Sequence, residues 1–322
     1  MQSHLQDMVQ EPAAAYAIGA LALLGAYKVA KGAMVMLGGV KRHMLRGHPD
    51  FSKYNKGDSW AVVTGGSDGI GLEICHQMAA AGFNICIISR TTSKIETKLR
   101  EISAKFPKLK TRGVTFDFSK HTTIKEYKEL IGDKLKDIDI GMLFLNAGFI
   151  EVGPFASLTP EDIESSVTIN ALQPIYTTKV LIDQMIARNH LGAMVVTSSG
   201  LGSKPVAGCL DYSCTKSFAS FLAEGLNYEL KGKVDCMAWQ SGKVATKMNG
   251  DEADGSHCVT TQVAVTGMLR HLGKESLTYG CVPHSKSMFM INYLMPWGMI
   301  QKMFWKEFCK VHEEQTLKKK QQ

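Results

Sequence analysis

From Ser59 onward, short runs of hydrophobic residues alternate with longer segments in which apolar residues recur at helical spacing. Most of the short runs are almost continuously hydrophobic, which is typical of strands that are buried on both faces of a parallel sheet. The predicted strands are 60–64, 85–89, 113–118, 141–145, 193–198 and 234–239, and the predicted helices are 69–81, 92–105, 122–135, 160–188 and 212–230. This alternation, which extends over about 180 residues, predicts an α/β fold with a doubly wound parallel sheet.

A different apolar pattern occupies the N-terminal region. Residues 13–27 are small or apolar without interruption, and apolar character resumes after Lys28 and Lys31 and continues to Val40. A helix over 13–27 spans only about 22 Å, less than the roughly 30 Å hydrocarbon layer of a bilayer. A helix that continues past both lysines, with their ammonium groups reaching toward the headgroups, is long enough. We expect a membrane anchor or a monotopic hairpin, and a buried core helix is the alternative.

The residues around this segment indicate an orientation. Asp7 and Glu11 precede it and the first arginine is Arg42, which disfavours a cleavable signal or a transit peptide. The basic residues that follow favour a cytosolic location for the rest of the chain. The last four residues, 319–322, resemble a dilysine retrieval signal of the endoplasmic reticulum, which acts from a cytosolic tail. We expect the endoplasmic reticulum membrane with the catalytic domain in the cytosol, and a mitochondrial membrane is the alternative.

These patterns divide the chain into three parts. Residues 1–55 form a membrane anchor and basic linker, 56–280 a dinucleotide-binding domain, and 281–322 a C-terminal extension that is first apolar and then lysine-rich. Within the extension, residues 288–308 contain Pro296 and Gly298, which argue against a spanning helix. The alternatives for this segment are an interfacial or substrate-covering role and packing against the sheet.

Composition excludes several classes of protein. The 322 residues are 45% hydrophobic and 21% charged, as in globular proteins. The eight cysteines form no C-x-x-C pair, so we expect reduced thiols and neither a metal site nor a disulfide framework. The net charge of +7 comes largely from basic residues near the chain ends, without interleaved aromatics. Membrane headgroups or a phosphorylated cofactor are therefore better partners than nucleic acid.

A glycine-rich segment follows the first predicted strand. Glycines at 65, 69 and 71 permit a tight turn from strand to helix and a close approach of the backbone to a pyrophosphate, which would rest at the helix N-terminus. This context predicts a Rossmann-type dinucleotide site. The second strand ends at Arg90, and an arginine there suits the 2′-phosphate of NADP(H) better than the ribose hydroxyls of NAD.

Tyr212 and Lys216 are four residues apart and therefore share one face of a predicted helix. A nearby ammonium group favours the phenolate, so Lys216 is expected to lower the pKa of Tyr212 toward neutrality. An amphipathic surface pair is the alternative explanation of this spacing.

Together these residues resemble the short-chain dehydrogenase/reductase family. Its Thr-Gly-x-x-x-Gly-x-Gly motif corresponds to residues 64–71, and Leu145 stands where its Asn-Asn-Ala-Gly motif has the first asparagine. Ser199 lies thirteen residues before Tyr212, which is the family spacing. The resemblance implies four catalytic residues, in which Tyr212 donates a proton, Ser199 binds the carbonyl oxygen, Lys216 also binds the nicotinamide ribose and Asn170 holds a relay water. It implies that Asp117 contacts adenine, and that NADP(H) is bound by Gly65, Ser67, Asp68, Gly69, Ile70, Gly71, Arg90, Asp117, Asn146, Ala147, Gly148, Tyr212, Lys216, Val244 and Thr246.

Within the family, the chain is most similar to the membrane-bound branch of very-long-chain 3-oxoacyl-CoA reductases and 17-beta-hydroxysteroid dehydrogenases. The residues that resemble this branch are the apolar N-terminus, 56–71, 87–91, 117–119, 244–248 and the lysine-rich end. The branch implies reduction of a long-chain 3-oxoacyl-CoA, or alternatively of a steroid ketone, and family members commonly form homo-oligomers. A second alternative is a non-catalytic accessory subunit of a membrane complex, since Ser241-Gly242 replaces the usual Pro-Gly after the sixth strand.

Overall fold

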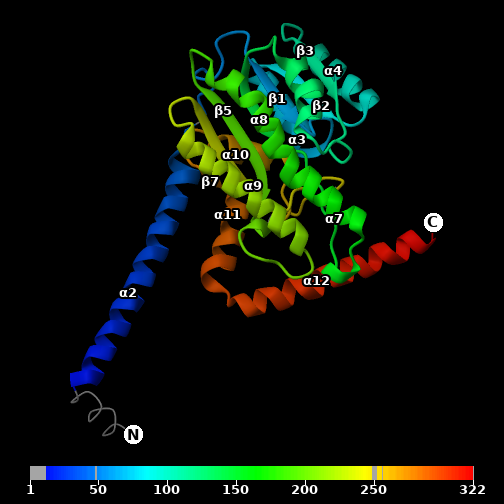
Figure 1. Ribbon diagram of the computed structural model, residues 1–322. Helices are drawn as coiled ribbons and strands as arrows, with labels where there is room; N and C mark the ends of the chain where they lie inside the picture. The colour runs from blue at the N-terminus through cyan, green and yellow to red at the C-terminus, as the bar shows by residue number, and fades with distance from the viewer. Residues whose placement is uncertain (1–11, 48, 249–251, 256, 322) are drawn as a thin grey trace. The chain divides into compact units, whose positions relative to one another are not determined.

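A parallel sheet of seven strands forms the centre of the main unit of the protein. The computed structural model describes residues 12–47, 49–248, 252–255 and 257–321, and the chain divides into one unit up to Arg46 and a second from Gly47 onward. In the second unit the strand order is β3-β2-β1-β4-β5-β6-β7, and every neighbouring pair is parallel (Figure 1). The strands are β1 (Trp60–Thr64), β2 (Asn84–Ser89), β3 (Thr111–Thr115), β4 (Ile140–Leu145), β5 (Gly192–Ser199), β6 (Val234–Ser241) and β7 (Leu277–Thr278). The predicted doubly wound sheet is confirmed.

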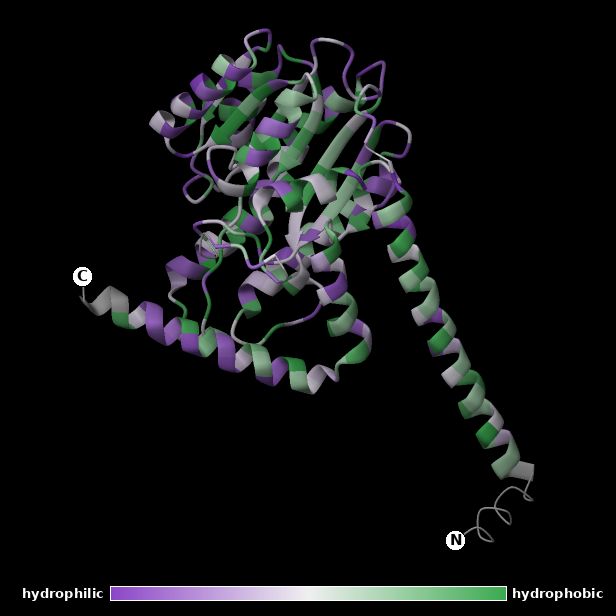
Figure 2. Cartoon of the chain, turned by 180° about the vertical axis from the view of Figure 1, so that it is seen from behind, coloured by the Kyte–Doolittle hydropathy of each residue, from purple (hydrophilic) through white to green (hydrophobic). Residues whose placement is uncertain are grey.

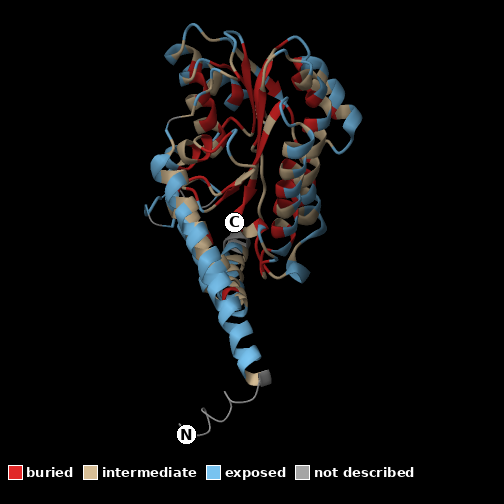
Figure 3. Ribbon diagram, turned by 90° about the vertical axis from the view of Figure 1, so that its left-hand side faces the viewer, coloured by how far each residue is buried: buried red, intermediate tan, exposed pale blue. Residues whose placement is uncertain are grey.

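Helices cover both faces of this sheet because its strands are apolar on both faces. Alternate residues of each strand point to opposite sides, and they belong to two separate buried clusters. One cluster joins the sheet to α3 (Gly69–Ala80), α4 (Thr92–Lys105) and α10 (Thr261–Leu269). The other joins it to α5 (Ile124–Tyr127), α6 (Asp133–Leu135), α8 (Gln173–Ile186) and α9 (Leu210–Glu229). Figure 3 shows the buried strands between the two helical layers.

Several elements differ from the sequence-based expectation. The third strand ends at Thr115, so Asp117 lies two residues beyond it. The expected helix 160–188 is divided into α7 (Pro160–Val167), a π-helical turn (Thr168–Leu172) and α8, and a second π turn (Lys128–Gly132) joins α5 to α6. Two short 3₁₀ turns lie at Phe155–Ser157 and Gly200–Gly202. Strand β7 has two residues, too few to produce a hydrophobic run in the sequence.

The N-terminal unit is a long helix, α2 (Pro12–Val40), followed by a π turn (Lys41–Leu45). Among the described residues, this is the one helix with the length and composition to cross a membrane. No residue of its most apolar stretch is buried by the protein, and apolar residues occur along its whole length (Figure 2). By its length and composition, this helix is a candidate membrane span. Asp7 and Glu11, used above to disfavour a signal peptide, lie outside the described residues.

The C-terminal extension contains α11 (Val282–Phe289), a π turn (Met290–Leu294) and α12 (Trp297–Gln321). Pro296 separates the last two elements, as expected of a residue that cannot continue a helix. Trp297, Phe304, Phe308 and Val311 line one side of α12 and pack against the main domain. The backbone of Lys319 and Lys320 continues α12, whereas Gln322 lies outside the described residues.

Candidate active site

The glycine-rich turn between β1 and α3 has the backbone geometry that a dinucleotide requires. Gly65 and Gly69 adopt positive φ angles of 67° and 53°, which favour glycine. A Cβ at Gly71 would lie 2.3 Å from the carbonyl oxygen of Gly65, so the helix can start this close to the strand only with glycine. The carboxylate of Asp68 accepts a hydrogen bond from the amide of Gly69 and pairs with Lys247 at 3.2 Å.

The loop after β4 is fastened to this turn by Thr64. Its hydroxyl oxygen accepts hydrogen bonds from the amides of Asn146 (2.8 Å) and Ala147 (3.0 Å), and the Asn146 side chain donates to the Thr64 carbonyl. A Cβ at Gly65 would lie 3.1 Å from the Cα of Ala147. This role of Thr64 was not predicted from the sequence. The one feature of the sequence that could have indicated it is the position of Thr64 directly before the first glycine of the motif.

Lys216 and Tyr212 lie in the first turns of α9, and their side chains reach toward the end of β5. The ammonium of Lys216 donates to the Thr197 carbonyl at 3.0 Å and lies 5.6 Å from the centre of the Tyr212 ring. The Lys216 side chain is buried, and this burial lowers its pKa to about 8. Ser199, the last residue of β5, accepts a hydrogen bond from the Leu201 amide at 3.2 Å and is close enough to Tyr212 to act on the pKa of its hydroxyl.

The pKa of Tyr212 shifts opposite to the direction expected from the spacing. Burial raises this pKa above its ordinary value, and the nearby Ser199 side chain opposes the shift only in part. The physical reason is that Lys216 directs its ammonium to a backbone carbonyl and lies over the face of the ring, not beside the hydroxyl. Desolvation of the phenolate therefore outweighs the attraction of the nearby cation.

Asn170 lies in the π turn between α7 and α8, a type of distortion that is frequent at functional sites. Its amide donates to the Phe149 carbonyl and its side-chain oxygen accepts from the Phe149 amide, so it holds the chain just after Gly148. A Cβ at Gly148 would lie 3.4 Å from the Lys216 nitrogen and 3.6 Å from the Asn170 oxygen. Three elements distant in sequence thus meet at Gly148.

The residues proposed for the adenosine end lie beyond β2 and β3. The hydroxyl groups of Ser67 and Ser89 are 2.9 Å apart, which places the glycine-rich turn beside the start of the exposed Arg90 segment. Burial acts to raise the pKa of Asp117, but hydrogen bonds from Ser119 and the positive charges of Lys120 and Arg90 hold it below its usual value. Arg90 is thus one of two cations near the Asp117 carboxylate.

The loop after β6 supplies the remaining predicted residues. Val244 is fully buried and forms a β-bridge with Val259. A Cβ at Gly69 would lie 3.3 Å from the methyl group of Thr246, so this loop contacts the glycine-rich turn. Ile70, the last of the residues predicted to bind the nucleotide in this region, packs against the adjacent hydrophobic core.

The C-terminal extension adds a wall that the sequence left undefined. Phe304 and Phe308 of α12 belong to the same apolar cluster as Tyr212. The Gln301 side chain bonds the Pro205 carbonyl and the Ala207 amide, and His312 donates to the Val152 carbonyl at 2.9 Å. Helix α12 is thereby fixed to the loops that flank Tyr212.

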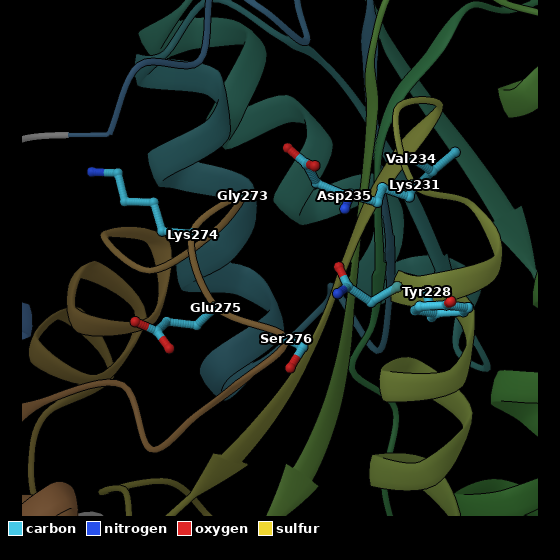
Figure 4. A pocket seen from close by; sticks show the side chains of 9 residues that line it. Tyr228, Lys231, Val234, Asp235, Gly273, Lys274, Glu275 and Ser276 are labelled. Carbon is cyan, nitrogen blue, oxygen red and sulfur yellow. The ribbon is translucent and has the colours of Figure 1, made fainter. Parts of the chain in front are cut away.

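No group of His, Cys, Asp or Glu among the described residues could hold a metal ion. Figure 4 shows a cavity in which Asp235 and Lys231 lie near Gly273 and Glu275, at the end of the sheet where β6 begins. The catalytic candidates instead lie where β4 and β5 end, so this cavity is separate from them.

A parallel sheet with a glycine-rich turn after its first strand is the architecture of dinucleotide-binding proteins. Residues 59–256 match the family model described as short chain dehydrogenase. A very-long-chain 3-oxoacyl-CoA reductase of Pyricularia oryzae is 36% identical over 270 residues, which cover 82% of this chain and 80% of that protein. The putative steroid dehydrogenase 3 of Caenorhabditis elegans is 34% identical over 238 residues, covering 72% of this chain and 74% of that protein.

A solved structure concerned with 7beta-hydroxysteroid dehydrogenase stereoselectivity has the same fold. Its TM-score is 0.67 at 19% identity, and the match covers 79% of this chain and 96% of that one. The chain belongs to the short-chain dehydrogenase/reductase family, in the branch with the very-long-chain 3-oxoacyl-CoA reductases and steroid dehydrogenases, and is an oxidoreductase.

Proposed function

We propose that this protein uses NADPH to reduce a carbonyl group on a lipid-like substrate, with Tyr212 as the proton donor. The observation that carries the proposal is that Lys216 and Asn170 meet at Gly148, while the Tyr212 ring lies beside the Lys216 ammonium and the Tyr212 hydroxyl lies near Ser199. They surround one small region at the ends of β4 and β5, next to the glycine-rich turn. Ligands of open α/β sheets bind outside the carboxyl ends of the strands.

The residues present fit NADP(H). The positive φ angles at Gly65 and Gly69 and the close approach of α3 to the strand at Gly71 form a tight turn that would hold a pyrophosphate at the N-terminus of α3. Exposed Arg90 offers a guanidinium group to a 2′-phosphate. A short-chain dehydrogenase from Sphingobium yanoikuyae, 22% identical with a TM-score of 0.60, was solved in complex with NADPH. When bound, NADPH would supply the hydride.

The protein's own groups would manage the proton and the developing charge. Because burial raises the pKa of Tyr212, its phenol is protonated at neutral pH and can donate to an alkoxide. Ser199 would hydrogen-bond the substrate oxygen as negative charge develops there. Lys216 would bind the nicotinamide ribose, where the cation would then favour the phenolate after proton transfer. Asn170, beside Lys216, would hold the relay water that restores the proton.

A long-chain 3-oxoacyl-CoA is the substrate we favour. Several relatives bear the name very-long-chain 3-oxoacyl-CoA reductase, and the apolar cluster of α12 beside Tyr212 suits an acyl chain. The steroid dehydrogenase names among the relatives favour a steroid ketone as the second candidate. Comparison of kcat/KM for the two substrates, with NADPH in excess, would distinguish them. Turnover of the ketosteroid without turnover of the thioester would reject the first.

The central test is Tyr212→Phe. This variant should lose at least 100-fold in kcat while it binds NADPH about as tightly as the wild type, since the substitution removes the proton donor alone. Tyr228→Phe, at an 84% exposed tyrosine of the same helix, is the matched control and should keep wild-type activity. Retention of more than about a tenth of kcat by Tyr212→Phe would exclude the role. Wild-type protein that binds no NADPH and co-purifies in a stoichiometric membrane complex would favour the accessory-subunit alternative.

For location, the proposal places α2 in the endoplasmic reticulum membrane with the oxidoreductase domain in the cytosol. The support is the length and apolar composition of α2 and the basic residues that follow it. Retention in the membrane pellet after alkaline carbonate washing, with protease access to the main domain in intact microsomes, would agree. Recovery with mitochondria would favour the alternative.

A further inference from the structure

The loop after β6 is held by a buried histidine from the C-terminal extension. His284, in α11, is 2% exposed. Its Nδ1 accepts a hydrogen bond from the Gly242 amide at 3.1 Å, and its Nε2 lies 3.1 Å from the Lys243 carbonyl oxygen. One imidazole therefore bridges the donor of one residue and the acceptor of the next.

This arrangement requires one state of the ring. Nδ1 can accept a hydrogen bond only when it carries no proton. The ring can donate to the Lys243 carbonyl only when Nε2 carries a proton. The neutral Nε2–H tautomer satisfies both contacts. In an imidazolium, Nδ1 also carries a proton, so two donors would face each other and the hydrogen bond from the Gly242 amide would be lost. Burial lowers the pKa of His284, although hydrogen bonds to the backbone of Lys243 and Tyr279 oppose the shift, and this direction agrees with a neutral ring.

Gly242 is fitted to this ring. A Cβ at position 242 would lie 2.5 Å from the imidazole, so a side chain there would displace His284. Neither Ser241 nor Gly242 restricts the backbone through its own covalent structure, since neither is proline. The direction in which the chain leaves β6 is therefore set by the contacts of the loop, and His284 supplies two of them.

The loop held in this way connects two parts of the proposed active site. At its start, Ser241 is the strand partner of Ser199 in the β5–β6 ladder. At its end, Thr246 contacts the glycine-rich turn at Gly69. A displacement of the backbone at Gly242 and Lys243 would therefore move the segment that lies between the substrate oxygen site and the pyrophosphate site.

We propose that His284 is a positioning residue whose neutral imidazole fixes residues 241–246 in the conformation that binds the nucleotide. It contacts neither substrate nor cofactor and acts through Gly242 and Lys243. The proposal rests on the proposed function, because it assigns His284 to the same nucleotide site.

The test uses the full-length chain in detergent and measures the Kd for NADPH by nucleotide fluorescence, together with amide hydrogen exchange over 242–246. In His284→Asn the side-chain oxygen can replace the Nδ1 acceptor, and in His284→Gln the side-chain amide can replace the Nε2 donor. We expect a Kd about fivefold weaker for each of these variants and about 25-fold weaker for His284→Ala, with faster exchange in the same order. In the same variants KM for NADPH should rise more than kcat falls.

His271→Asn is the control, because His271 is equally buried but bonds Thr278 at the end of β7. It should lower Tm without changing the Kd for NADPH. If the His284 variants lower Tm as His271→Asn does while Kd and exchange over 242–246 stay within twofold of wild type, the residue is only structural and the proposal is wrong. Asn and Gln preserve most of the ring's volume, so the comparison does not depend on the folding of His284→Ala. Wild-type protein that binds NADPH but turns over no carbonyl substrate would reject the proposed function while leaving the positioning test intact.

Discussion

Substitution of Lys216 by methionine should change how the stability of the nucleotide-free protein depends on pH. The ammonium is 3% exposed and its one described hydrogen bond goes to a neutral carbonyl, that of Thr197. Burial lowers its pKa to about 8 in the folded protein, whereas a lysine in the unfolded chain has a pKa of about 10.4. Below pH 8 both states are protonated, and the folded state carries the full cost of a buried charge.

The direction and size of the effect follow from these two values. Between pH 8 and 10.4 the unfolded chain binds the proton more strongly than the folded protein, so the free energy of unfolding rises with pH. At 1.36 kcal/mol per pKa unit, the cost at neutral pH is about 3 kcal/mol, of which about 2 kcal/mol is regained by pH 10. Lys216→Met has no such charge, so its stability advantage over the wild type should shrink by about 2 kcal/mol over this range.

Thermal unfolding of the full-length protein in detergent, at intervals from pH 7 to pH 10, measures this difference. Subtraction of the two profiles removes the contribution of all other titrating groups. A matched control is Lys125→Met, at a lysine whose side chain is 82% exposed, and its profile should run parallel to that of the wild type. A constant difference between Lys216→Met and the wild type from pH 7 to pH 10 would refute the buried ammonium and the pKa argument with it.

Three further changes test other parts of the site. Gly71→Ala should weaken NADPH binding at least tenfold, because its Cβ would overlap the Gly65 carbonyl. Gly225→Ala is the control and should bind NADPH normally, because no atom lies within 4 Å of the new Cβ. Equal NADPH affinity of the two variants, measured by titration, would contradict the proposed nucleotide site at this turn. Arg90→Glu should raise the Kd for NADPH but not for NADH, since it replaces the cation offered to the 2′-phosphate. Arg100→Glu, at another exposed arginine, is the control. An equal loss of affinity for both nucleotides in Arg90→Glu would contradict a contact between Arg90 and the 2′-phosphate. Phe308→Ala should raise KM for long-chain substrates more than for short-chain substrates, because the ring belongs to the apolar cluster that includes Tyr212. An unchanged chain-length preference would show that α12 does not contact the substrate.

The fold and the nucleotide turn were predictable from the sequence because both depend on local patterns. Runs such as 85–88 are apolar at every position since both faces of the strand are covered, and this run lies within β2. The conformations of Gly65 and Gly69 follow from the need for a short turn between strand and helix. The roles of the catalytic candidates came from the family resemblance, and they stay predictions that Tyr212→Phe can test.

Contacts between distant segments could not be read in this way. The spacing of Tyr212 and Lys216 correctly implied a shared helix face, but not that the ammonium would turn to the Thr197 carbonyl. The direction of the pKa shift at Tyr212 depends on burial, which is a property of the whole fold. A single histidine at 284 carries no periodicity or motif, so its bonds to Gly242 and Lys243 appear only in three dimensions.

The family match covers one part of the proposed site and ends before another part. Residues 59–256 contain the glycine-rich turn, Ser199, Tyr212 and Lys216, so the nucleotide turn and these candidate catalytic residues lie in the matched part. The groups that shape the other side of the site, His284 of α11 and the aromatic side of α12, lie beyond it. Helix α12 is held to the loops beside Tyr212 by side chain to backbone hydrogen bonds from Gln301 and His312 and by its apolar side, so it forms part of the surroundings of Tyr212. We therefore expect the C-terminal extension to determine substrate choice. Exchange of residues 281–321 between two relatives should transfer the chain-length preference. The nucleotide preference should not change, because it depends on Arg90, which lies outside the exchanged segment.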